Sequence, residues 1–157
     1  MITLEKLAQI CSILNKYEIK YVLIGGCAVI LHGLERTTMD IDVIIENSSE
    51  NINKLKKAFS PFLKENELNE INPEIIQKYK VIRIGLEGFF VDILTLACDI
   101  TYDKVKEDMF FEKISDVEIP VAGVNIMLKL KQTFREIDIK DRLFLIGKKE
   151  YIQKHKK

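Results

Sequence analysis

Residues 21–45 read YVLIGGCAVILHGLERTTMDIDVII and decide the fold. The first four residues are apolar and stop at Gly25-Gly26, a pattern that predicts a short buried strand. CAVILHG follows and predicts a short helix closed by Gly33. After the polar loop LERTTM, the segment DIDVII alternates polar and apolar residues, which predicts a strand with two different faces.

On either side of this stretch, the sequence predicts further helices and a hairpin. Thr3 is a candidate N-cap for a helix over 4–18, where apolar residues recur at helical spacing. Ser48 and Ser49 are cap candidates for a helix to about residue 64, which Pro61 kinks or ends early. The inner face of this helix is expected to carry Ile52, Leu55, Phe59 and Phe62. A shorter helix is expected from about Pro73, then a hairpin around Leu86-Glu87-Gly88.

The remaining third predicts more helix than strand. Residues 101–119 suggest a helix and then a short strand ending at Pro120. From Val124 we expect two or three helices, broken near Ile137-Asp138 and at Gly147. The order predicts an α/β (α+β) fold, a small mixed sheet with helices on one side. We expect one domain over 1–157, with a core of about 20–100 and C-terminal helices of about 123–155.

Composition narrows the class of protein. The chain has 157 residues, 24 Lys and Arg against 24 Asp and Glu, and no net charge, which argues against nucleic-acid binding by bulk counterion release. The tail GKKEYIQKHKK is either a local basic face or a solvated end. No apolar run approaches the roughly 20 residues of a membrane helix, and the three cysteines have no metal or redox spacing. A cytoplasmic protein without a membrane partner is expected.

Two aspartates in the second strand predict a metal site. Asp40 and Asp42 are separated by one residue, so both carboxylates leave the same face while Ile41 and Val43 enter the core. Like charges held this close repel unless a cation lies between them. Magnesium, which prefers oxygen ligands and is commonly held by one or two carboxylates plus substrate phosphates, is the expected partner. A D-x-D pair alone could equally be an exposed strand face.

A third carboxylate, Asp92, is the only charge in FFVDILTL. Burying an unpaired charge in such a strand is costly, so its face is expected to open on the same metal site. Two metal ions could then activate a hydroxyl and neutralise a departing pyrophosphate, with Asp92 taking the proton. The alternative is that Asp92 pairs with Arg83 across the hairpin.

Groups that could bind phosphate surround these carboxylates. Gly25 and Gly26 let the backbone approach a ligand, and the helix that follows offers free N–H groups. Arg36 could fork onto phosphate oxygens, and Thr38 could bind phosphate or orient a carboxylate. Singly, a Gly-Gly pair is often a turn and an arginine often a surface residue. Their combination in this order favours a metal–nucleotide site.

The segment from Gly25 to Gly33, followed by Arg36-Thr37-Thr38-Met39-Asp40-Ile41-Asp42, resembles the opening motif of the polymerase-beta-like nucleotidyltransferase superfamily. In that family a third carboxylate comes from a later strand, and Asp92 matches it. The form is similar to the small prokaryotic branch, which includes minimal nucleotidyltransferases and the toxins of abortive-infection systems. The close match covers residues 21–45, and Asp92 extends it.

The resemblance implies function and further site residues. It implies transfer of a nucleoside monophosphate from a nucleoside triphosphate to a hydroxyl of RNA such as tRNA, of a protein or of a small molecule. Mg²⁺, or Mn²⁺, would be the cofactor, and an antitoxin could be the partner. Lys129 and Lys140-Asp141 resemble residues that contact the triphosphate or support the site. The sequence REIDIKD is longer than the family's R-x-K-D, which displaces Arg135.

Two other functions remain open on the same fold. One is a non-catalytic binding module, an antitoxin or regulator, which neutral charge and short length favour. The other is a metal-dependent phosphodiesterase, because the same carboxylates could activate water. The first gains nothing from the mutual repulsion of three carboxylates, and the second would hydrolyse without forming an acceptor adduct.

Overall fold

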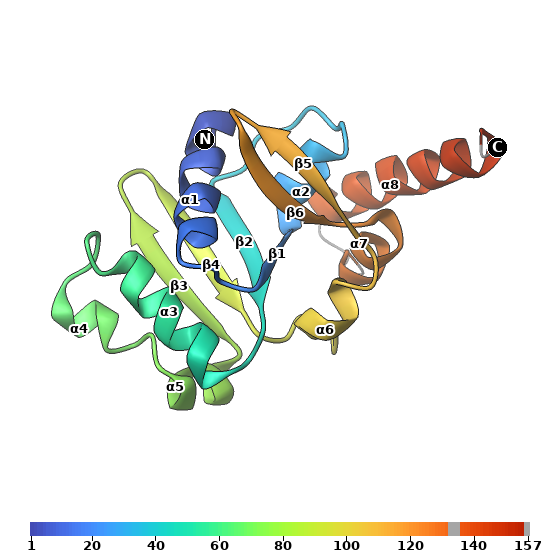
Figure 1. The fold of residues 1–157 in the computed structure, drawn as a ribbon. Coiled ribbons are helices and arrows are strands. Elements are labelled where there is room, and N and C mark those ends of the chain that lie inside the picture. The colour runs from blue at the N-terminus through green and yellow to red at the C-terminus, as the bar shows by residue number, and fades with distance from the viewer. Residues whose placement is uncertain (132–135, 156–157) are drawn as a thin grey trace.

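The computed structural model describes residues 1–131 and 136–155, which form a six-stranded mixed sheet in the order β3-β4-β2-β1-β6-β5 (Figure 1). The β2–β4 and β1–β6 pairs are parallel, and the other neighbouring pairs are antiparallel. The predicted mixed α/β architecture is therefore confirmed. The strands are β1 (Tyr21–Ile24), β2 (Asp40–Ile45), β3 (Val81–Leu86), β4 (Phe89–Leu94), β5 (Met109–Ile114) and β6 (Val117–Ala122).

The helices pack around this sheet, and the last one projects from it. In Figure 1, α8 extends away from the strands, at the other end of the molecule from α4 and α5. No helix in the described part of the chain is long and apolar enough to span a bilayer. The helices are α1 (Leu4–Lys16), α2 (Gly25–Leu31), α3 (Ser49–Phe59), α4 (Glu65–Leu68), α5 (Pro73–Tyr79), α6 (Tyr102–Val105), α7 (Val124–Leu130) and α8 (Glu136–Lys154).

The segment 21–45 folds as β1, α2 and β2, as predicted. All four residues of β1 are buried, and Ile24 lies opposite Asp42 in the antiparallel β1–β2 pair. Helix α2 begins at Gly25, two residues earlier than predicted, so the diglycine is its first turn rather than a separate corner. Gly25 has a φ of 72°, a left-handed conformation that glycine adopts without a Cβ penalty.

Helix starts were predicted better than helix ends. Thr3 and Ser48 cap α1 and α3, each accepting a hydrogen bond from the backbone N–H three residues on. Helix α3 stops at Phe59, because Pro61 cannot continue the backbone hydrogen-bond ladder. Phe62, predicted on the inner face, is consequently 53% exposed, so that expectation was wrong.

The predicted β3–β4 hairpin is confirmed, but a second hairpin was missed. Residues 109–122 form β5 and β6 around Ser115-Asp116, where two left-handed φ angles make the turn. Pro120 lies inside β6 opposite Phe111 and does not end the strand. Proline is tolerated there because on its other side β6 meets β1 through a single register pair, Leu23 with Val121.

The C-terminal third also differs from the prediction. Two helices are present, α7 and α8, and the break expected near Ile137-Asp138 falls at the first turn of α8, whereas α8 runs unbroken through the second expected break, Gly147. A helical glycine costs only about 1 kcal/mol relative to alanine, which is too little to end a helix of this length. Asp138, Asp141 and Leu145 are buried, so α8 turns two carboxylates toward the body of the protein.

Candidate active site

The sheet register brings the three predicted carboxylates together. Strands β2 and β4 run parallel with Asp42 beside Asp92, and Asp40 lies two residues earlier on β2. Ile41 and Val43, on the opposite face of β2, are completely buried. Residues that alternate along one strand share a face, so Asp40, Asp42 and Asp92 form one carboxylate cluster.

Arg83 supplies the positive charge that this cluster meets. Its register partner across the β3–β4 hairpin is Asp92. Its Nε donates to Asp92 Oδ1 at 2.9 Å and its Nη2 to Asp92 Oδ2 at 2.9 Å, while Asp40 Oδ2 lies 3.5 Å from Nη2. The guanidinium also lies 4.7 Å above the Phe90 ring. The alternative pairing of Asp92 with Arg83 is therefore present. The arginine side chain is nevertheless 54% exposed, so it can move outward into solvent.

One guanidinium leaves the three carboxylates short of positive charge. Burial, together with the negative charges of Asp92 and Asp40, raises the pKa of Asp42 to about 7, although the Lys131 ammonium opposes the shift. Without another cation, Asp42 thus retains its proton at pH values where an ordinary aspartate is ionised.

These donors are the hard oxygens that magnesium prefers. Within residues 1–131 and 136–155, no group of three or more His, Cys, Asp or Glu side chains is arranged to hold a metal ion. The unmet negative charge and the shared face nevertheless fit a divalent cation once the Arg83 guanidinium moves outward. Manganese, with the same ligand preference, would fit equally.

Glycine at the start of α2 is needed for the position of Asp42. A Cβ built on Gly25 would lie 2.2 Å from Asp42 Oδ2, a distance that forces atoms to move. A Cβ on Gly26 would lie 3.1 Å from Thr38 Oγ1 and 3.2 Å from the guanidinium carbon of Arg36. The diglycine therefore lets a carboxylate and two polar side chains close around one backbone turn.

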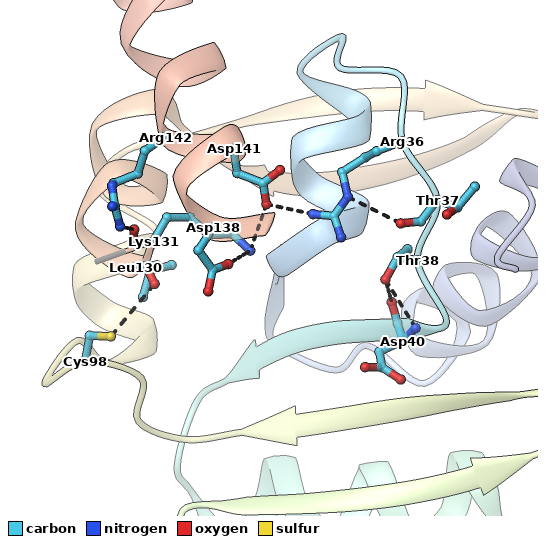
Figure 2. Close-up of polar contacts among 10 residues, drawn as sticks. All are labelled: Arg36, Thr37, Thr38, Asp40, Cys98, Leu130, Lys131, Asp138, Asp141 and Arg142. Atoms are coloured by element: carbon cyan, nitrogen blue, oxygen red, sulfur yellow. Dashed lines mark hydrogen bonds and ion pairs between the residues drawn. The ribbon is translucent and has the colours of Figure 1, made fainter. Parts of the chain in front are cut away.

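The loop before β2 ties the cluster to the C-terminal helix (Figure 2). Thr38 Oγ1 accepts from the Asp40 backbone N–H at 3.3 Å, which holds the first residue of β2. Arg36 Nη1 donates to Asp141 Oδ2 at 2.6 Å, and its Nε donates to the Thr37 carbonyl at 3.3 Å. Thr38 thus lies against Asp40, and Arg36, next to Gly26, is held by Asp141.

Asp141, which the family resemblance singled out together with Lys140, is the centre of a buried ionic network whose other members on the C-terminal side, Lys131 and Asp138, were not predicted. Its carboxylate is fully buried, and Figure 2 shows it between Arg36 and Lys131, whose Nζ lies 3.3 Å away. Lys131 also contacts Asp138 at 3.3 Å, and Arg142 donates to the Lys131 carbonyl. Among the described residues, Asp141 Oδ1 has no hydrogen-bond partner. Two cations and two carboxylates therefore join the start of α8 to the loop before β2.

Lys131, and not its neighbour Lys129, is the lysine of this segment that acts on the carboxylate cluster. Lys129 is exposed on α7, and Lys140 is exposed and pairs with Glu136 one turn earlier at 3.5 Å. Lys131, in contrast, is buried and lowers the pKa of Asp42. It follows the buried Met127 by four residues, a spacing that could have placed it on the inner side of α7. Arg135 lies outside the described residues.

Comparison with known proteins agrees with this fold. A family model described as "Nucleotidyltransferase of unknown function (DUF6036)" matches residues 2–119. A provisionally described nucleotidyltransferase of Thermotoga maritima, TM1012, superimposes with a TM-score of 0.54 at 18% identity, over 96% of this chain and 90% of that one. An antigenic nucleotidyltransferase-like protein of Paracoccidioides brasiliensis gives 0.55 at 14% identity, over 92% and 75%. No curated protein matches. The solved structures support the fold alone.

Proposed function

Because the chain belongs to the nucleotidyltransferase family of unknown function DUF6036, we propose that it transfers a nucleoside monophosphate from a nucleoside triphosphate to a hydroxyl group. The observation that carries the proposal is the pairing of Asp42 with Asp92 on parallel strands, with Asp40 on the same face. Three carboxylates facing one another are costly in a protein that only needs to fold, and useful in one that binds a cation.

The three carboxylates would hold magnesium. A bound divalent ion supplies Lewis-acid charge to the triphosphate and lowers the pKa of an attacking hydroxyl. Asp92 is proposed to accept the acceptor's proton, a role that requires the Arg83 guanidinium to leave its two oxygens. Once displaced, Arg83 still borders the cluster and can neutralise charge on a bound phosphate.

The cations on the other side of the cluster are proposed to receive the triphosphate. Arg36 uses Nε and Nη1 in its observed contacts, so further guanidinium N–H groups are left for phosphate oxygens. Lys131 brings a second positive charge close enough to act on Asp42. Asp141 holds both cations by opposite charge. Lys129 and Lys140 remain in the proposal as surface cations on α7 and α8.

The acceptor class is proposed from the family resemblance and is best found by assay. Purified protein is incubated with each labelled nucleoside triphosphate, magnesium and one acceptor pool: total tRNA, cell proteins or small hydroxyl compounds. We expect a labelled adduct that disappears in Asp42→Asn and in Asp92→Asn. Asp103→Asn, an exposed aspartate on α6, is the matched control and is expected to retain activity. Adduct formation of equal yield in all four proteins would refute the proposal, and free phosphate or cleaved RNA without adduct would indicate a phosphodiesterase.

A non-catalytic binding module is the second candidate, and the Arg83 contacts favour it. An arginine that stays on Asp92 and Asp40 offsets part of the negative charge of the cluster without a metal. Calorimetry separates the two functions. A transferase binds a non-hydrolysable triphosphate only with magnesium and loses that binding in Asp42→Asn, whereas a binding module responds to neither change. A toxin role would further require growth arrest that Asp42→Asn abolishes.

A further inference from the structure

Helix α8 carries an exposed apolar face on the side opposite the one it buries. Six of the fourteen large hydrophobic side chains that are exposed among the described residues belong to this helix. Leu143, Ile146 and Ile139 are 66%, 43% and 38% exposed, and at 100° per residue they fall within one 60° sector. The buried Asp141 and Leu145 point the other way. Solvent-exposed faces of helices are ordinarily polar, so this face has the character of an interface.

A glycine and a hollow lie beside this face. Gly147 follows Leu143 by one turn, and apart from its chain neighbours and the backbone of its own helix, no described atom comes within 4 Å of the place its Cβ would occupy. Glycine is disfavoured in a helix interior, and nothing within the described chain uses the space that it leaves. Gly33, Leu143, Gly147 and Tyr151 are among the residues that line a hollow of about 500 Å³ there. The surface of α8 therefore places the exposed side chain of Leu143 next to a hollow that is large enough to hold a leucine side chain.

The charged residues at the two ends of α8 are placed so that each would face the opposite charge on an antiparallel copy of the same helix. Glu136 and Lys140 stand near its start, and Glu150 and Lys154 stand near its end. Reversing the helix about the level of Leu145 puts Lys140 level with Glu150 and Glu136 level with Lys154. The same reversal brings Leu143 level with Gly147. Both ion pairs and Leu143 thus meet their complement on an identical surface, which is the condition for a two-fold symmetric interface.

We propose that the protein forms a homodimer through antiparallel packing of α8 against α8, with Leu143 of each copy entering the hollow at Gly147 of the other. The interface lies on the face of α8 remote from Asp141, so each buried ionic network stays intact. It does not depend on catalysis and holds equally for a binding module.

Sedimentation velocity of the whole chain over a wide concentration range tests this directly. We expect a concentration-dependent dimer, and at least about a tenfold rise in its Kd for Leu143→Glu. Tyr79→Glu, an equally exposed residue on α5, is the matched control and should leave Kd unchanged. Gly147→Ala should weaken the dimer although alanine favours helix.

A charge exchange tests the antiparallel direction. Lys140→Glu alone puts a glutamate of one copy opposite Glu150 of the other, so the dimer Kd should rise. The double variant Lys140→Glu/Glu150→Lys restores opposite charges at this contact and should return Kd to the wild-type value. Circular dichroism verifies that each variant is folded. A monomeric wild type, a dimer insensitive to Leu143→Glu, or a double variant no tighter than Lys140→Glu would each overturn the proposal.

Discussion

The buried carboxylate of Asp141 offers the most quantitative test of how α8 is joined to the site. In Asp141→Asn the side chain keeps its shape and loses its charge. Arg36 Nη1 at 2.6 Å and Lys131 Nζ at 3.3 Å then face a neutral amide, and their side chains are only 15% and 10% exposed. Neither cation can recover full hydration without moving.

Removing one partner of a buried ion pair typically costs about 3–5 kcal/mol, because an uncompensated charge is left behind. The lower end applies here, since asparagine still offers an oxygen to Arg36 and Lys131 retains Asp138. For a chain of this size, a loss of about 3 kcal/mol lowers Tm by about 6–12 °C.

Thermal and urea unfolding, each followed by circular dichroism, measure this loss. Glu136→Gln is the matched control, because Glu136 is on the same helix and its side chain is 86% exposed in its pair with Lys140. Its effect should stay within about 0.5 kcal/mol. Equal stability of Asp141→Asn and Glu136→Gln would refute the inference that the buried network joins α8 to the loop before β2.

Three further predictions concern Gly25, the carboxylate of Asp42 and the cysteine thiols. Gly25→Ala should lower the free energy of unfolding by about 1–2 kcal/mol because of its left-handed φ, and should also lose magnesium-dependent nucleotide binding. Gly88→Ala is the control: Gly88 has a φ of 86° and open space around it, so this variant should lose stability alone. Equal losses of nucleotide binding in calorimetry would contradict the prediction. Because the pKa of Asp42 is raised, the folded state keeps a proton that the unfolded state releases, so the free energy of unfolding in urea should fall as pH rises from 3.8 to about 7. Asp42→Asn should flatten this pH dependence. Parallel curves of stability against pH for the wild type and Asp42→Asn would contradict the prediction. Cys98 is exposed, whereas burial raises the pKa of the Cys11 and Cys27 thiols to about 12. A disulfide reagent should therefore react with one thiol in the native protein and with three in denaturant. Reaction of more than one thiol in the native protein would show that the core opens.

The parts of the fold predicted from sequence are those with local signals. A four-residue apolar run ended by glycines, followed by a D-x-D strand, placed β1, α2 and β2 without knowledge of any distant contact. The face shared by Asp40 and Asp42 follows from strand periodicity alone. The placement of Asp92 beside Asp42 needed in addition a parallel pairing of β2 with β4, which the isolated charge of Asp92 in an apolar strand suggested.

The parts that were missed depend on tertiary contacts. Lys131 and Asp138, like Asp141, which only the family resemblance singled out, are charged residues on or beside helices, and such residues are ordinarily exposed. Only the packing of α8 against the loop of Arg36 makes them a buried network. The β5–β6 hairpin was missed because Pro120 argues locally against a strand, while the short β1–β6 pairing that tolerates it is visible only in three dimensions.

The central claim is that Asp40, Asp42 and Asp92 share a cation that takes the place now held by the Arg83 guanidinium. A crystal structure of the protein with magnesium and a non-hydrolysable nucleoside triphosphate tests it most directly. The account predicts a metal ion bound by carboxylate oxygens from both β2 and β4, phosphates near Arg36, and Arg83 withdrawn from Asp92. A bound triphosphate without metal at these carboxylates, with Arg83 still paired to Asp92, would contradict it.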